Sequence, residues 1–130
     1  MARLYNVAVA SLAIRAPIKW TDNLLSQHPI PDVHRIARGV ARGISWSALV
    51  RIALVRELHV RLGCAIQQSV SLATELLASP DSSISPDGSI ILAFDRQAFE
   101  RALQFRLAEA LEVAPRPRRG RPPSKPARAG

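Results

Sequence analysis

Cysteine and histidine are too scarce and too scattered in this sequence to suggest a metal centre. Cys64 is the single cysteine among 130 residues, which excludes an internal disulfide and a cluster of thiolate ligands. The histidines His28, His34 and His59 are six and twenty-five residues apart, and neither spacing matches a zinc signature. We therefore expect no metal site and no cofactor.

Long apolar runs and catalytic motifs are also missing. No apolar run approaches the roughly 20 residues that span a bilayer. Polar residues interrupt the N-terminal stretch "MARLYNVAVASLAIRAP" too often for a secretion signal. There is no pair of carboxylates on one helical face, no nucleophile–base motif and no phosphate-binding glycine loop. These absences favour a cytoplasmic protein that is neither an enzyme nor attached to a membrane.

Positive charge is abundant, and it falls in two separate blocks. The net charge is +8 at pH 7. Residues 1–63 carry nine Lys or Arg and three acids, residues 64–114 carry three and seven, and residues 115–130 carry six and none. Two basic blocks separated by an acidic one indicate two polyanion-binding surfaces. Sixteen of the eighteen basic residues are arginine, which GC-rich coding would also produce, so the arginine count alone carries little weight.

Helical patterns dominate the first 79 residues. We expect helices over residues 7–14 and 17–26, a third from a cap at Ser45 or Ser47 to Gly63, and a fourth over 65–78. Prolines, glycines and β-branched residues in 28–45 predict a two-stranded excursion with a turn. The third helix is apolar on two sides, which is typical of a central helix. With only 5% aromatic residues, aliphatic side chains and alanine must fill the core.

The segment after Pro80 predicts a strand over residues 89–94 and a helix that begins after Asp95 and ends near residue 112. A lone strand has unpaired edges, so it should pair with "SSIS" in a hairpin, with another chain, or with both. We interpret residues 80–114 as a dimerisation element and expect a homodimer. The expected core contacts are given helix by helix: Ile18, Leu24 and Leu25 in the second, Ile66, Val70, Ala73 and Leu77 in the fourth, and Phe99, Ala102, Leu103, Ala110 and Leu111 in the last.

Two short helices, a proline-marked turn, a strand-like excursion and a long helix form the order of a winged helix–turn–helix. The second helix would lie in the major groove, and the basic wing along an adjacent backbone or minor groove. The candidate DNA contacts of the second helix and the turn before it are Arg15, Lys19, Thr21 and Asn23. Those of the wing are Arg35, Arg38 and Arg42.

The stretches "VAVASLAIRAPIKWTDNLL" and "RIARGVARGISWSALVRIALVREL" resemble the MerR-like winged helix–turn–helix group, which includes excisionase-like regulators. Lys19-Trp20 is similar to the basic–aromatic step of that group's recognition helix, and residues 38–42 are similar to its wing. For Trp20 itself, a role as a core or wing-packing anchor is favoured over a base contact. The resemblance covers roughly residues 5–77. The cysteine-bearing effector region of metal-sensing members is absent, and Val40 and Ile44 stand where the wing aromatic is common.

Residues 115–130 hold five prolines, six basic residues and no large aliphatic side chain. Such a segment buries too little apolar surface to offset its conformational entropy, so we expect it to be disordered when free. Within it, Arg118, Arg119, Gly120, Arg121 and Pro122 resemble an AT-hook. The glycine lets the backbone approach the floor of a narrow minor groove, along which the flanking arginines extend. The alternative is a basic tail that binds polyanions without preference.

The sequence therefore predicts a mainly α protein with small β elements. We expect a winged helix–turn–helix DNA-binding domain over residues 1–79, a strand–helix dimerisation element over 80–114, and a disordered AT-hook-like tail over 115–130. The expected role is a bacterial transcriptional regulator that binds double-stranded, AT-rich DNA in the nucleoid. The alternatives are a nucleoid-associated architectural or silencing protein, and an antitoxin-like or adaptor protein whose acidic 64–114 segment binds a protein partner.

Removing the tail tests its resemblance to an AT-hook. A chain ending at Ala114 should lose more affinity for AT-rich than for GC-rich duplexes, because the minor-groove contacts of Arg119 and Arg121 are gone. Binding titrations on both duplexes at two salt concentrations, with the full and the shortened chain, measure this difference. Unchanged affinity and unchanged AT preference would show that the tail makes no minor-groove contact.

Overall fold

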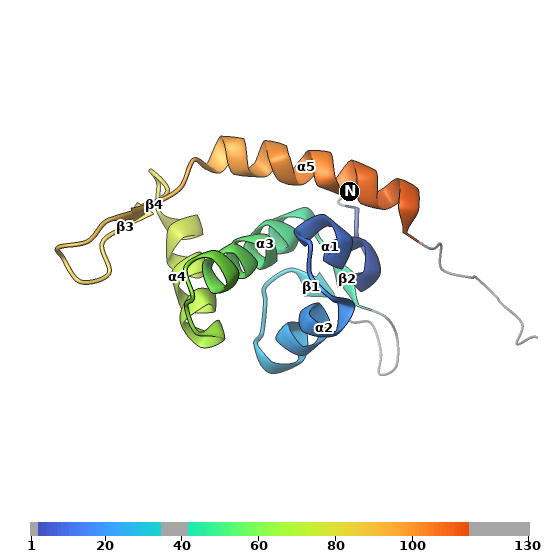
Figure 1. Ribbon diagram of the computed structural model, residues 1–130, viewed down its shortest axis with the longest axis horizontal. Helices are drawn as coiled ribbons and strands as arrows, with labels where there is room; N and C mark the ends of the chain where they lie inside the picture. The colour runs from blue at the N-terminus through green and yellow to red at the C-terminus, as the bar shows by residue number, and fades with distance from the viewer. Residues whose placement is uncertain (1–2, 35–41, 115–130) are drawn as a thin grey trace, which may run out of the picture.

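The computed structural model describes residues 3–34 and 42–114, which form a mainly helical protein with two small sheets (Figure 1). This confirms the predicted fold class at the level of mainly α with small β elements. The helices are α1 (Val7–Ile14), α2 (Ile18–Gln27), α3 (Trp46–Arg61), α4 (Ile66–Ala78) and α5 (Arg96–Val113). Antiparallel pairs join β1 (Val33–His34) to β2 (Gly43–Ile44) and β3 (Ser83–Ile84) to β4 (Leu92–Ala93).

Local signals determine where the first two helices begin and end. The Asn6 side chain accepts a hydrogen bond from the backbone N–H of Val9 at 2.8 Å and so caps α1. The helix ends at Arg15, whose φ of 59° and ψ of 47° are left-handed. Pro17 precedes the first residue of α2. The helix stops before His28, because Pro29 biases the residue before it towards extended backbone. Both predicted helices are therefore confirmed to within one residue.

α3 is the central helix, as its two apolar sides predict. The Ser45 hydroxyl accepts a hydrogen bond from Ala48 N–H at 3.2 Å, which confirms one of the two predicted caps. After the helix, Gly63 adopts a φ of +71°, a conformation that glycine accepts without strain. Along α3 the buried side chains face several directions: Ala48, Leu49, Val50, Ile52, Ala53, Leu54, Val55 and Leu58.

α5 returns across α1 and joins the same core (Figure 1). Its buried residues are Leu103, Leu107 and Ala110, an i, i+4, i+7 set on one helix face. The predicted inclusion of Ala102 and Leu111 in the buried face is wrong, because both are exposed at the edges of that face. Leu103, Leu107 and Ala110 thus belong to the same cluster of buried residues as the helices before residue 80. A dimerisation role for residues 80–114 stays a prediction.

The other expected elements are found with shorter strands. The strand predicted over residues 89–94 is limited to β4, and its expected hairpin partner is confirmed, since Ile84 pairs with Leu92. On α2, Leu24 is buried as predicted, whereas Ile18 is 55% exposed. On α4, Ala73 is buried as predicted, and Leu76 rather than Leu77 is the next buried residue. None of the helices among the described residues is both long enough and apolar enough to cross a membrane.

Shortening Leu107 tests the packing of α5 on α1. Leu107 is 6% exposed, so Leu107→Ala should lower the free energy of unfolding by about 2–4 kcal/mol through lost contacts and a cavity. The control is Phe105→Ala on the same helix, whose side chain is 66% exposed and whose loss should change stability by less than about 1 kcal/mol. Urea unfolding monitored by circular dichroism compares the two. Equal small effects would mean that α5 does not pack on the core in solution.

Candidate nucleic-acid interface

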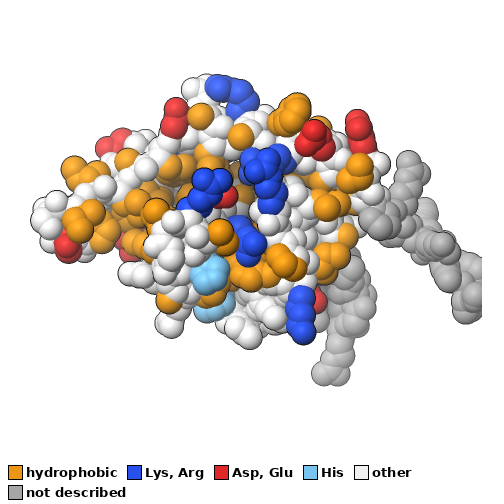
Figure 2. Space-filling view, in the orientation of Figure 1, with side chains coloured by type: hydrophobic (Ala, Val, Ile, Leu, Met, Phe, Trp, Pro, Cys, Tyr) orange, Lys and Arg blue, Asp and Glu red, His pale blue; other side chains and the backbone are white. Residues whose placement is uncertain are grey.

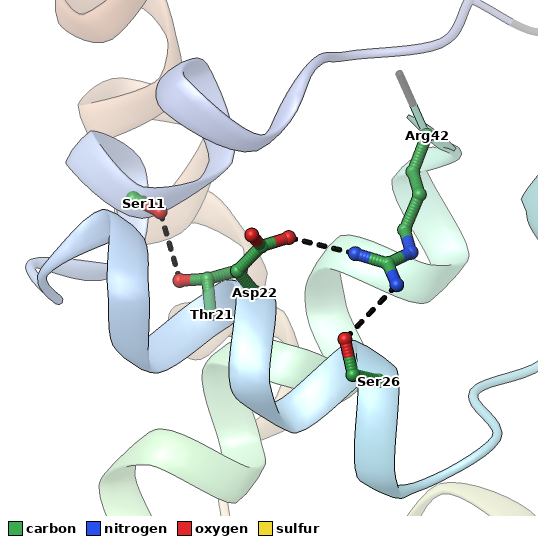
Figure 3. A network of polar contacts seen from close by, with 5 residues as sticks. All are labelled: Ser11, Thr21, Asp22, Ser26 and Arg42. Carbon is green, nitrogen blue, oxygen red and sulfur yellow. Dashed lines mark hydrogen bonds and ion pairs between the residues drawn. The ribbon is translucent and has the colours of Figure 1, made fainter. Parts of the chain in front are cut away.

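A buried hydrogen bond holds α2 against α1. The Ser11 hydroxyl of α1 donates to Thr21 Oγ1 of α2 at 2.8 Å, and the two residues are 1% and 0% exposed (Figure 3). The prediction that Thr21 contacts DNA is therefore wrong, because its side chain faces the core. Thr21 lies three residues before the buried Leu24, and this helical spacing is the signal that sequence reasoning overlooked.

The opposite face of α2 is exposed and polar. Lys19 and Asn23 lie one turn apart on it, and both are exposed. These two predicted contacts are therefore accessible to a ligand outside the protein. Asp22, Ser26 and Gln27 extend the same surface. We call these five residues, Lys19, Asp22, Asn23, Ser26 and Gln27, the α2 surface.

Arg42, which comes just before β2, joins the hairpin to the α2 surface (Figure 3). Its Nη1 lies 2.7 Å from Asp22 Oδ1, and its Nη2 donates to Ser26 Oγ at 3.1 Å. The side chain of Arg42 is 14% exposed, whereas that of Asp22 is 55% exposed. Arg42 therefore positions the hairpin and offsets the charge of Asp22. Sequence reasoning missed this pairing because 20 residues separate the partners.

The base of the hairpin is held by the N-terminal segment. Tyr5 N–H donates to Ile44 O, and Ile44 N–H donates to Tyr5 O, each at 2.8 Å. On its other side, Ile44 pairs with Val33 of β1. A Cβ on Gly43 would lie 2.8 Å from Leu4 Cδ1, so a glycine fits this close approach. β2 thus has a paired segment on each side, which fixes its position in the fold.

Trp20 is a packing anchor, the second of the two roles its sequence position suggested. Its ring lies 4.8 Å from the Arg56 guanidinium carbon and 6.3 Å, centroid to centroid, from the His59 ring, both on α3. The His59 Nδ1 atom lies 2.8 Å from Cys64 O, which holds the imidazole in place. These contacts fix the orientation of α2 relative to α3.

Arg15 lies in the turn that connects α1 to α2, where its side chain is exposed. The predicted wing contacts Arg35 and Arg38 lie outside the described residues. So do the AT-hook-like residues Arg118, Arg119, Gly120, Arg121 and Pro122. Within residues 3–34 and 42–114, no group of three or more His, Cys, Asp and Glu side chains is placed to hold a metal ion.

A scan against protein-family models and searches of curated proteins and solved structures found no match to the chain. The resemblance to MerR-like proteins therefore depends on the quoted residues, and the function has to be argued from the surface itself.

Thr21→Val tests the buried contact between α1 and α2. It leaves the buried Ser11 hydroxyl without its partner and should lower the free energy of unfolding by about 1–3 kcal/mol. The double variant Ser11→Ala/Thr21→Val removes both polar groups, so it should be more stable than Thr21→Val alone. Denaturation of the wild type, both single variants and the double variant gives the coupling energy. Additive effects would show that the two hydroxyls do not interact.

Proposed function

We propose that the chain binds double-stranded DNA through a winged helix–turn–helix body. The observation that carries this proposal is the α2 surface, an exposed polar face on a helix whose other side is firmly packed. Ser11 and Thr21 hold this helix to α1, and Trp20 holds it to α3. A recognition helix needs this combination, because its side chains must reach base edges from a fixed backbone.

The residues of the α2 surface suit the chemistry of the major groove. Lys19 supplies a cation for a phosphate or for guanine O6 and N7, and Asn23 supplies the amide that pairs with adenine N6 and N7. Asp22 is the one acid among these residues, and its ion pair with Arg42 reduces its repulsion of phosphates. The same ion pair holds Arg42, just before β2, beside α2, and a wing that ends there would meet the adjacent backbone or minor groove.

The distribution of charge supports a second contact through the tail. Residues 115–130 carry six basic residues and no acid, and they include the AT-hook-like stretch. A tail tethered to a bound domain meets the same duplex at a high effective concentration, so two modest contacts bind more tightly together than either does alone. We therefore propose a regulator of transcription with a preference for AT-rich DNA, and an architectural or silencing protein is the nearest variant of this role.

A protein-binding role is the second candidate, because two apolar side chains project from the β3–β4 hairpin. Ile90 and Ile91 are 61% and 75% exposed, and the hairpin extends away from the helices (Figure 1). Exposed apolar side chains on an acidic segment suit a protein partner or a second copy of this chain. Retention of a partner after nuclease treatment would favour this candidate, and loss of the partner would favour DNA binding.

Changing Lys19 and Asn23 tests the proposed function. Lys19→Ala should weaken binding to all duplexes and reduce the slope of log K against log salt by about 0.9, the value for one lost phosphate contact. Asn23→Ala should weaken binding to preferred sites alone, by about 1–3 kcal/mol of binding free energy. Selection from a randomised duplex library would show this change as a lost base preference.

The matched controls are Arg101→Ala and Gln97→Ala on α5, which remove the same charge and the same amide from exposed positions outside α2. Both controls should bind as the wild type does. If the variants on α2 bind as tightly and as selectively as these controls, α2 is not the recognition helix.

A further inference from the structure

Arginine side chains from three parts of the chain converge on the turn between α1 and α2. Arg106 of α5 donates from Nε to Ala13 O at 2.8 Å. Arg56 of α3 donates from Nη2 to Arg15 O at 3.4 Å. Arg15 itself lies in the turn with its side chain exposed. We call Arg15, Arg56 and Arg106 the arginine cluster. In Figure 2, Lys and Arg side chains gather in the middle of the face below α5.

Helix capping explains only part of this arrangement. The last carbonyl groups of α1 lack partners within the helix, and cations are favourable beside them. One donor of Arg106 and one of Arg56 serve that purpose. Each guanidinium has five donors, however, and most of them remain for another ligand. Capping also gives no reason for the exposed Arg15 side chain to lie near Arg106.

Two members of the cluster, Arg15 and Arg106, bring like charges near one another. Burial has the largest effect on the pKa of Arg106 and lowers it. The positive charge of Arg15 also lowers this pKa, while the negative charge of Glu57 raises it. Glu57 itself pairs with Arg61 at 3.2 Å. Among the ion pairs formed by the described residues, none includes a member of the cluster. Like charges held together without a paired acid favour the binding of an anion.

An open groove gives an anion access to the cluster. The groove has a volume of about 400 Å³ and lies between α1 and the C-terminal half of α5. Arg15 and Arg106 line it together with Leu12, and Glu109 and Glu112 line it further along α5. The two glutamates make that part of the groove unfavourable for an anion, so the arginine end is the part that suits one. Arg56 does not line the groove; it approaches the turn from α3, where its guanidinium carbon lies 4.8 Å from the Trp20 ring centroid.

We propose that the arginine cluster binds a phosphate group of the DNA backbone beside the groove that α2 enters. Guanidinium groups offer planar, paired donors that match phosphate oxygens. Arg15 lies three residues before α2, so a backbone held there flanks the α2 surface. This inference rests on the proposed function, and it makes α5 part of the DNA contact. A free phosphorylated compound has the same chemistry, and the experiment distinguishes the two sources.

The first measurement uses Arg15→Gln in the full chain. This change removes a charge but no side-chain hydrogen bond to a carbonyl of α1, so the fold should be unaffected. It should weaken DNA binding about tenfold, the cost of a lost charged hydrogen bond, and lower the salt slope by about 0.9. The control, Arg101→Gln, removes the same charge from an exposed position of α5 and should change neither quantity.

Arg106→Lys separates phosphate binding from capping. Lysine keeps the charge beside α1 but loses the paired donors, so DNA affinity should fall while the free energy of unfolding changes little. The proposal is wrong if two results are found together. Arg106→Lys would lower the free energy of unfolding without changing DNA affinity, and Arg15→Gln would have the same affinity and salt slope as Arg101→Gln. The cluster would then be a helix cap.

A second measurement uses inorganic phosphate and protein without DNA. Phosphate, at ionic strength held constant with chloride, should shift the NMR signals of the Arg56 and Arg106 Nε–H groups in the wild type and not in Arg15→Gln. If phosphate shifts these signals in the wild type but Arg15→Gln binds DNA as tightly as the wild type does, the cluster does not bind the DNA backbone. It is then a site for a free phosphorylated compound. If the chain binds no DNA at all, the proposed function fails, and the phosphate shift still decides whether the cluster holds anions.

Discussion

The burial of α3 is the constraint on which the rest of the structure depends. This helix carries apolar side chains on several sides, and it can be stable only if other elements cover each of them. α4 packs along it, and α1 and α5 cover it elsewhere. α1 is itself short and apolar, and five of its eight residues are buried between larger elements. The most apolar helices, α1 and α3, thus form the interior, and the polar surface available to a ligand is provided mainly by the other elements.

α2 is the element that remains, and its contacts show how a short helix is held in place. It is not central, and only Thr21 and Leu24 are buried along it. A hydroxyl pair, an aromatic ring against α3 and an ion pair to Arg42 act from three directions. Each is weak by itself, but together they determine the rotation of the helix about its axis. That rotation decides which side chains face outwards, and it is why Lys19 and Asn23 share the exposed surface.

The signals that sequence reasoning found are local, and those that it missed are not. Ser45, Gly63 and Asp95 act on the backbone within a few residues, so the helix limits follow from the sequence. The burial of Thr21 depends on Ser11 in another helix, and Arg106 meets Ala13 across 93 residues. The buried face of α5 was misplaced for the same reason. Its apolar residues surround more of the helix than one partner can cover, and the position of α1 selects among them.

Arginine shows why the placement of charge matters more than its amount. Arg42 and Arg61 each pair with a carboxylate, so they add little to the field that a polyanion meets. Arg15 and Arg106 lie close enough for repulsion to affect the pKa of Arg106, and they keep their charge facing a groove. Composition counts all four alike. An arginine-rich chain from GC-rich coding would place them without regard to sign, whereas here like charges converge at the turn that leads into α2. The position of each arginine, and not the number of arginines, therefore decides which of them can take part in the proposed anion contact.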